Sequence, residues 1–299
     1  MPCRNAERGL FPFMVLCALI LSSCAPVRRA DLIEADLRQS IEDAYQKFST
    51  GQSRCVSGWD ADISITWKSS LKDFSFPGYL QALPPSFFKL VVSNPLGQPL
   101  KLLTTDGEQY RYIDVADRSG IYGGTRSWAV RYDLPYTVIS RSWPDWLQGR
   151  PDGGKQRVIS EIRHDREDRG VWLTVADVEM ETPAQQAIAA PYLDADSPDS
   201  DTQKPDMTLP VYEYLLVDAE TGVIKEQIVL DERQKPQATI IYNQWENIGQ
   251  CRYPLDIEIT DLPYGGYIHL EFSEIRQTDL TASDFKIAIP PGFTRTMMP

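Results

Sequence analysis

The feature that most constrains the fold is the alternation of polar and apolar side chains that begins at Asp60. Ile63, Ile65 and Trp67 occupy every second position there, with polar residues between them. A period of two is typical of a β-strand with one buried face. Similar segments, bounded by Gly and Pro, predict further strands at 75–83, 86–93, 100–105, 109–114, 120–123, 157–163, 171–180, 211–217, 223–230, 238–245, 255–260 and 267–275.

Helical patterns are few. Apolar residues recur at spacings of three and four between 31 and 49, which predicts an N-terminal amphipathic helix. The stretch 134–149 predicts one or two short helices, with Pro144 suited to a first turn. Strands and helices do not alternate regularly, so the strands should pair antiparallel. The sequence therefore predicts a mainly β fold: a strongly curved antiparallel sheet of about eleven strands, forming an unclosed half-barrel with helices as a lid.

The first residues have the pattern of a bacterial lipoprotein signal. An apolar run ends at Leu21-Ser22-Ser23-Cys24 and is shorter than the roughly 20 residues that a membrane-spanning helix needs. Small residues before a cysteine are typical of a lipobox, so we expect a signal peptide at 1–23 and lipid attachment to Cys24. A plain secretory signal with a chance cysteine is the alternative.

This N-terminus also predicts location and domain organisation. The residue after the lipobox cysteine is Ala25 rather than the Asp that commonly retains lipoproteins at the inner membrane, which favours a lipid anchor at the periplasmic face of the outer membrane. We expect a tether at 24–30 and a single domain at 31–299. The Pro-, Asp- and Ser-rich stretch 183–206 fits neither strand nor helix and predicts a disordered acidic insertion in that domain.

The charge balance limits the partners. The formal net charge is -12, and no cluster of Lys and Arg is present. Neutralising nucleic-acid phosphates requires such clusters, so nucleic acid is excluded as a partner. An electrostatic grip on anionic lipid is disfavoured for the same reason.

Cysteine use points to a possible disulfide. Of the five cysteines, two fall within the signal and Cys24 receives the lipid, which leaves Cys55 and Cys251. A periplasmic location permits these two to pair, which would tie the start of the strand region to strands near the C-terminus. Two unpaired buried thiols are the alternative.

Residues that carry chemistry are sparse. The only histidines, His164 and His269, lie in separate strand regions, and no nucleophile elbow, Cys-x-x-Cys pair or phosphate-binding glycine loop accompanies them. The mixed charge run 163–169 predicts a solvated hairpin turn. Asp60 and Asp62 could serve a glycosidase, but an alternating strand produces such pairs routinely. We expect no catalytic residues, no metal site, no cofactor and no enzymatic activity.

Large apolar side chains are numerous, and a sheet curved toward a barrel can enclose a hydrophobic cavity that admits acyl chains. The alternative is that the same side chains pack a solid core. Residues expected to line the cavity are Ile63, Ile65, Trp67, Phe88, Leu90, Val92, Leu102 and Trp146.

Specific motifs favour the cavity, because this chain resembles the LolB family of outer-membrane lipoprotein receptors. Three segments carry the resemblance, in the family's order: the turn Asn94-Pro95-Leu96-Gly97, the helix-ending Trp146, Gly149 and Pro151, and the strand segment 253–261. The resemblance spans nearly the whole chain after the signal, and it implies the family's half-barrel fold.

The resemblance also implies a function. A LolB-like receptor takes lipoproteins from a soluble LolA-like periplasmic carrier, shelters their acyl chains and helps insert them into the outer membrane, without making or breaking a bond. Leu96, between Pro95 and Gly97, would enter the membrane. Without the resemblance, an ordinary exposed leucine in a turn would be the interpretation.

The chain departs from the family in its length, its insertion and its cysteine pair. An envelope scaffolding lipoprotein, which would use the same fold to bind a protein partner or another hydrophobic ligand, is therefore the alternative. We expect a monomer in either case.

Overall fold

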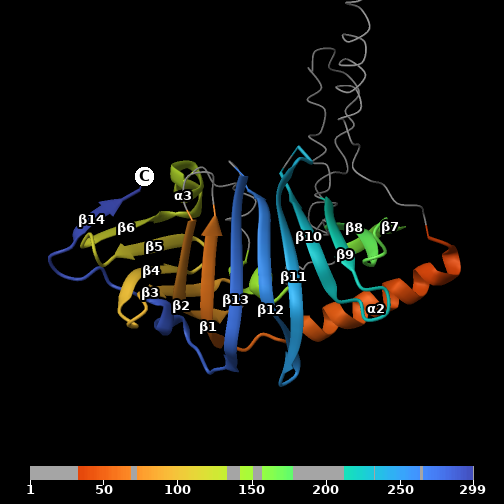
Figure 1. The fold of residues 1–299 in the computed structure, drawn as a ribbon, viewed down its shortest axis with the longest axis horizontal. Helices are drawn as coiled ribbons and strands as arrows, with labels where there is room; N and C mark the ends of the chain where they lie inside the picture. The colour runs from red at the N-terminus through yellow and green to blue at the C-terminus, as the bar shows by residue number, and fades with distance from the viewer. Residues whose placement is uncertain are drawn as a thin grey trace, which may run out of the picture.

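A computed structural model describes residues 33–68, 73–132, 142–150, 157–177, 212–231, 233–262 and 265–298. These form one 14-stranded sheet that bends strongly and does not close (Figure 1). The strands are β1 (Trp59–Lys68), β2 (Asp73–Leu83), β3 (Phe87–Ser93), β4 (Pro99–Thr105), β5 (Gln109–Asp114), β6 (Ser119–Gly124), β7 (Arg157–His164), β8 (Val171–Asp177), β9 (Tyr212–Val217), β10 (Ile224–Leu230), β11 (Pro236–Ile248), β12 (Cys251–Leu262), β13 (Gly266–Gln277) and β14 (Thr294–Met297).

This architecture confirms the predicted fold class of a curved, unclosed and mainly β sheet. The number of strands is larger than the expected eleven or so, because each alternating segment forms a strand of its own and the short β14 adds another. The pairing is antiparallel as predicted, except that β14 runs parallel to β6.

The sheet consists of two meanders joined at a seam. The first runs from β1 to β6 and the second from β7 to β13, and in each of them every strand pairs with the next in sequence. At the seam β1 pairs with β13, where Ile63 lies opposite Phe272 and Ile65 opposite Leu270. In Figure 1 the strands next to the seam stand upright, and β3 to β6 run crosswise to them.

The N-terminal helix α2 (Ala35–Ser53) covers one side of the second meander. Near its start, Arg38 donates a hydrogen bond to the Ile159 carbonyl of β7. Near its end, the Phe48 ring lies edge-on to Trp245 of β11 with 5.6 Å between centroids. The predicted helix therefore exists, displaced a few residues toward the C-terminus. We call the side of the sheet that it covers the inner face.

The core lies between this helix and the inner face. Every second residue of the strands points into it, which is the direct consequence of the period-two pattern. Fully buried members on the second meander include Leu173, Val175, Leu215, Val217, Ile240 and Ile257. From α2, Ile41, Tyr45 and Phe48 fill the space against them.

The turn between β9 and β10 shows how closely the helix packs. Gly222 has a φ of +70°, a conformation that favours glycine. A Cβ built on it would lie 2.2 Å from the Ala44 carbonyl oxygen of α2. A hairpin turn therefore joins β9 to β10, and its glycine is required by the helix that rests on it.

The short helix α5 (Trp143–Leu147) covers the first meander near the seam. The Ser142 side chain caps the start of this helix by accepting a hydrogen bond from the Asp145 amide. Pro144 lies in the first turn, as predicted. The Trp143 ring stacks on Phe88 of β3 at 5.5 Å. A second helix, α3 (Thr125–Tyr132), follows β6 and was not expected from the sequence.

Cys55 and Cys251 form a disulfide, which joins the end of α2 to the start of β12. Beside it, Arg150 and Asp145 form a buried ion pair with 2.7 Å between Nη2 and Oδ1. Arg150 also donates to the Cys55 carbonyl at 2.6 Å. These contacts fix α5 against the end of α2.

The opposite side of the sheet, the outer face, is covered over the first meander by the C-terminal segment. Its short 3₁₀ helix (Ala282–Phe285) places the carbonyl of the buried Phe285 2.9 Å from the Thr104 hydroxyl. Arg111 of β5 donates to the Ile287 carbonyl at 3.1 Å. The segment ends in β14, whose pairing extends the sheet beyond β6.

Candidate functional site

The strands that flank β2 bring most of the predicted lining residues onto the inner face. In β1, Ile63, Ile65 and Trp67 lie on this face, and in β3 the inner positions are Phe88, Leu90 and Val92. Ile63 and Phe88 are buried in the core, whereas the residues farther along each strand are more exposed. The exposure rises along β1 until Trp67, whose surface is 53% accessible.

Two predicted lining residues have other positions. Leu102 lies opposite Val91 and Ile113, so its side chain is on the outer face, and its neighbour Leu103 takes the inner position opposite Leu90. Trp146 is on the inner side but is buried in α5, with its ring against Trp143 at 5.7 Å.

An apolar surface remains at the end of the inner face beyond α5. We call it the apolar rim; it consists of Ile65, Trp67, Phe74, Phe76, Val92 and Ile268. Trp67 lies opposite both Phe74 and Ile268, and the rings of Phe74 and Phe76 stack at 5.8 Å. Phe74 is 40% accessible. Phe74 and Phe76 were not among the predicted lining residues, although their spacing of two in the segment before Pro77 is a strand signal.

The β3–β4 turn begins one residue beyond this strand end. Its Asn94 side chain holds the loop closed: Oδ1 accepts from the amides of Leu96 and Gln98, both at 3.0 Å. The Gly97 amide donates to the Asn94 carbonyl at 2.9 Å, and Gly97 has a φ of +78°. Leu96 stands at the tip with 83% of its surface exposed. An apolar side chain is thus displayed on a well-bonded turn.

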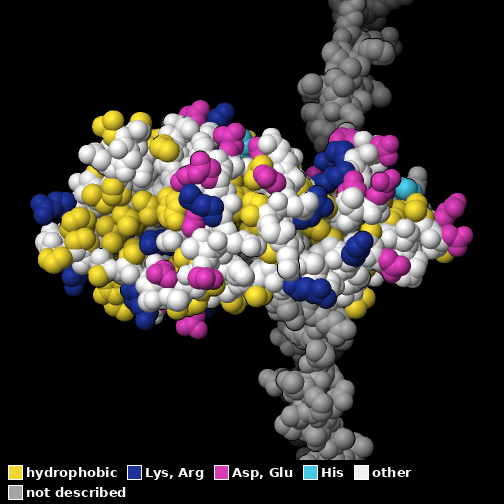
Figure 2. Space-filling view, turned by 90° about the horizontal axis from the view of Figure 1, so that it is seen from below, with side chains coloured by type: hydrophobic (Ala, Val, Ile, Leu, Met, Phe, Trp, Pro, Cys, Tyr) yellow, Lys and Arg dark blue, Asp and Glu magenta, His cyan; other side chains and the backbone are white. Residues whose placement is uncertain are grey.

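The two ends of the molecule differ in the side chains that they expose. Seen from below, hydrophobic side chains gather over the end that carries β3 to β6 and β14, and charged side chains are more frequent toward the other end (Figure 2). The first meander is therefore the more apolar end on this side as well.

One group of side chains could hold a cation. Asp256, His269 and Glu271 lie on the outer face of β12 and β13, with ligand atoms within 4.8 Å of one another. His269 Nε2 is 2.9 Å from Asp256 Oδ2, and Asn243 donates to the other Asp256 oxygen at 3.1 Å. In the sequence Asp256 stands apart from the other two, and cross-strand neighbours cannot be read without the register.

The two carboxylates considered for glycosidase chemistry, Asp60 and Asp62, have different surroundings. Asp60 is buried and accepts from Arg276 at 2.9 Å and from the Thr278 hydroxyl at 2.7 Å. Asp62 is exposed and lies beyond a register shift in the pairing of β1 with β13. Asp60 therefore has a structural role in holding the end of β13.

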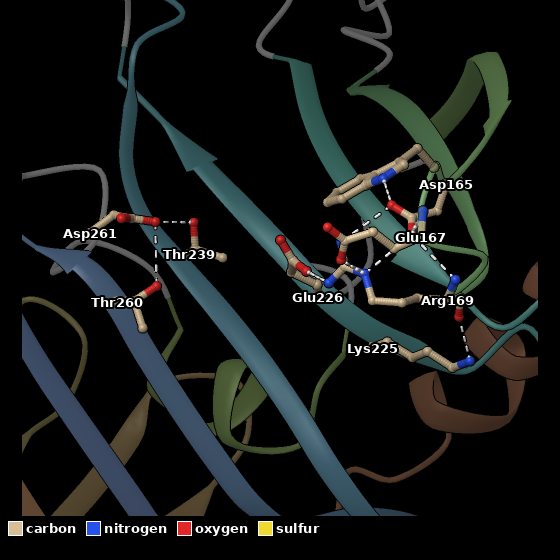
Figure 3. Close-up of polar contacts among 9 residues, drawn as sticks. Asp165, Glu167, Arg169, Lys225, Glu226, Thr239, Thr260 and Asp261 are labelled. Atoms are coloured by element: carbon tan, nitrogen blue, oxygen red, sulfur yellow. Dashed lines mark hydrogen bonds and ion pairs between the residues drawn. The ribbon is translucent and has the colours of Figure 1, made fainter. Parts of the chain in front are cut away.

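The charge run 163–169 forms the predicted hairpin turn between β7 and β8, but it is more ordered than a solvated turn. The side chain of Asp165 lies at its centre and is only 6% accessible. Its carboxylate accepts from the Trp172 indole at 2.8 Å and from the Arg169 side chain at 3.2 Å (Figure 3). Burial acts to raise the pKa of Asp165, but the hydrogen bonds from Arg169 and Trp172 outweigh it and hold the pKa below its usual value.

Cys24, the tether, the signal segment, Pro151 and the acidic insertion lie outside the described residues. Among the residues that are described, no helix is long and apolar enough to cross a membrane.

Comparisons with known proteins identify the fold. No family model and no curated protein matches the sequence. Among solved structures, a LolA superfamily protein from Nitrosomonas europaea is similar with a TM-score of 0.52 at 10% identity, over 83% of this chain and 97% of that one. A DUF1329 family protein from Desulfovibrio piger is similar with a TM-score of 0.53 at 9% identity, over 83% of this chain and 97% of that one. The chain therefore has a LolA-like fold.

Proposed function

We propose that this protein is a lipid-anchored outer-membrane lipoprotein that binds the acyl chains of other lipoproteins and helps insert them into that membrane, as a LolB-like receptor does. The observation that carries the proposal is the exposed apolar rim, at the strand end from which the Leu96 turn projects, on a LolA-like sheet. Cys24 would hold the protein at the periplasmic face. A LolA-like carrier with its lipoprotein cargo would be the partner, and the protein would act as a monomer without catalysis.

The rim suits an acyl chain because all six of its side chains are apolar. Trp67, Phe74 and Phe76 offer adjoining ring surfaces, and the remaining rim residues are aliphatic. Each methylene of an acyl chain that leaves water gains about 0.8 kcal/mol. Transfer from carrier to receptor to bilayer then runs downhill if each site holds the chains more tightly than the one before it.

The turn supplies the contact with the membrane. Burying an exposed leucine in hydrocarbon gains about 1.5–3 kcal/mol, enough to favour a transient contact but too little to anchor the protein. Because Asn94 and Gly97 fix the loop, Leu96 would enter without a cost for ordering the turn. The lipid on Cys24 would provide the lasting attachment.

A transfer assay tests the proposal. Protein lacking residues 1–24 is mixed with a LolA-like carrier loaded with a lipoprotein, and acceptance is followed by co-purification; delivery is followed by flotation with liposomes. Leu96→Glu should accept cargo normally and deliver it poorly. Val130→Glu, at another exposed apolar residue on α3, is the matched control and should deliver normally. Normal delivery by Leu96→Glu would remove the membrane role of the turn, and failure of the wild type to accept cargo would refute the receptor function.

The dense packing under α2 favours a second candidate, the scaffolding lipoprotein. Much of the inner face is filled by side chains from α2 and α5, which leaves the rim as the apolar surface for a partner. An apolar dye distinguishes the two functions. Displacement of the dye by an acylated peptide, weakened by Trp67→Ala, supports an acyl site, and absence of any uptake supports scaffolding.

A further inference from the structure

A pocket of about 580 Å³ lies on the outer face of the second meander, on the opposite side of the sheet from the acyl-binding rim. Its floor comes from outward-pointing residues of neighbouring strands: Trp172, Thr174, Tyr214, Ile228 and Leu230. Thr174 lies opposite Tyr214, and Tyr214 lies opposite Ile228, so the floor crosses three strands in register. Its volume is in the range of small-ligand sites.

The aromatic part of the floor consists of two side chains, one of which is held by a hydrogen bond. Trp172 and Tyr214 are diagonal neighbours on β8 and β9. The indole of Trp172 is fixed by its 2.8 Å hydrogen bond to the nearly buried Asp165. Tyr214 is 37% exposed. Two ring surfaces therefore face the pocket, and the hydrogen bond leaves the Trp172 ring little freedom to lose when a ligand binds.

The wall beside the floor is held by a connected network of charges. Arg169 contacts both Asp165 and Glu226, with 2.7 Å between its Nη1 and Glu226 Oε2. Lys225 donates to the Arg169 carbonyl at 2.6 Å, as Figure 3 shows. Arg163 forms an ion pair with Glu161, which lies two residues earlier on β7. These groups support the pocket before any ligand arrives.

The charges in the lining balance. Three arginines, at 163, 166 and 169, are matched by Glu161, Asp165 and Glu167. Such a wall gives no net attraction to an anion or a cation, but it presents many hydrogen-bond donors beside carboxylate acceptors. An acyl chain would displace water from these charged groups without replacing its hydrogen bonds, which is unfavourable.

We propose that this pocket binds a neutral saccharide. A sugar ring has apolar C–H faces that match an aromatic floor, and its hydroxyl groups act as donors and acceptors at once, which matches a wall of paired arginines and carboxylates. The site is separate from the rim, so a lipoprotein of this kind would contact an envelope glycan on one side of its sheet and acyl chains on the other. Its occupancy does not depend on the proposed transfer function.

The test uses the purified full-length protein in detergent with two neutral probes, chitotetraose and maltotetraose, in calorimetric titration. At least one probe should bind with millimolar affinity or better. Tyr214→Ala should weaken that binding by about tenfold, because it removes one aromatic contact. Trp172→Phe keeps an aromatic ring but loses the hydrogen bond to Asp165, and it should weaken binding by a smaller factor.

The matched control is Tyr267→Ala, which removes a tyrosine from the same face of the sheet on β13, outside the pocket. It should bind the probe like the wild type, and circular dichroism should show that all the variants are folded. Absence of binding by both probes overturns the proposal, as does equal loss in the control. Displacement of an apolar dye from the pocket by a fatty acid, sensitive to Tyr214→Ala, would assign the pocket to lipids and would also overturn it.

Discussion

The two meanders use the same alternating pattern but differ in what covers their inner faces. Over the second meander, α2 buries the inner face almost completely. Over the first, the inner face remains accessible at its end, where Trp67 and Phe74 are 53% and 40% exposed. The pattern of residues thus determines which side of a strand is apolar, and the packing of a distant helix determines whether that side becomes core or binding surface.

Two tryptophans of β1 provide the strongest test of this difference. Trp59 is fully buried, with Tyr253 at 5.5 Å and Phe272 at 6.1 Å. Trp59→Ala should lower the free energy of unfolding by about 3–5 kcal/mol. Trp67→Ala, on the same face of the same strand, should lower it by about 1 kcal/mol or less. Urea denaturation measures both, and equal losses would show that the rim is packed like the core.

The disulfide beside α2 should account for the next largest effect. It closes a loop with a sequence separation of 196, and the double variant Cys55→Ser with Cys251→Ser should lose about 2–5 kcal/mol of stability. Denaturation midpoints with and without a reductant give the same comparison for the wild type. A midpoint that does not respond to reduction would mean that α2 is held by packing alone.

Substitutions at two glycines in the left-handed conformation distinguish the cost of backbone strain from the cost of a clash with the helix. Gly222→Ala brings a Cβ against the Ala44 carbonyl, and we expect a loss of about 3 kcal/mol. Gly97→Ala meets no atom within 4 Å and should cost only the backbone strain, about 1 kcal/mol. Thermal unfolding of both variants checks this, and similar losses would show that α2 does not press on the β9–β10 turn.

The smallest expected effect concerns pH. Partial burial acts to raise the pKa of Asp218, but hydrogen bonds from Lys225 and Thr221 lower it to about 2 from its usual 3.8. The lowered pKa in the folded state means that Asp218 stabilises the protein above about pH 4 and loses this contribution as the pH falls toward 2.

Because the Asp218–Lys225 pair is partly exposed, its contribution should stay below about 1 kcal/mol. Asp218→Asn should therefore reduce stability slightly at pH 6 and not at pH 2, measured by urea denaturation. The same turn contains Gly222, which packs against α2. A loss of stability above about 1 kcal/mol would therefore indicate that the charge of Asp218 also affects this packing.

Much of the sheet could be predicted from the sequence, because alternation encodes both the strand and its buried side. The prediction was wrong for the side of Leu102, since adjacent leucines at 102 and 103 leave the alternation undefined. The short β14 and α3 were missed because each is too brief for a period to emerge. Their positions depend on contacts with β6 and β5.

The candidate sites were less predictable than the fold. Leu96 could be singled out through its turn residues, but its exposure depends on how the rest of the chain packs around the turn, which no local pattern encodes. Asp165 looked like one charge among many; its central role arises from cross-strand neighbours that only the register supplies. Phe74 and Phe76 became part of a surface because of what α2 leaves uncovered.

The seam between β1 and β13 has a consequence for how the molecule folds. Each meander can form through contacts between consecutive strands, but Ile63 and Phe272 can meet only after most of the chain between them has been organised. Contacts so distant in sequence slow folding, because the loop must be closed before they stabilise it. Joining the two meanders should therefore be the late, rate-limiting event, and until then both seam strands present open edges to other chains.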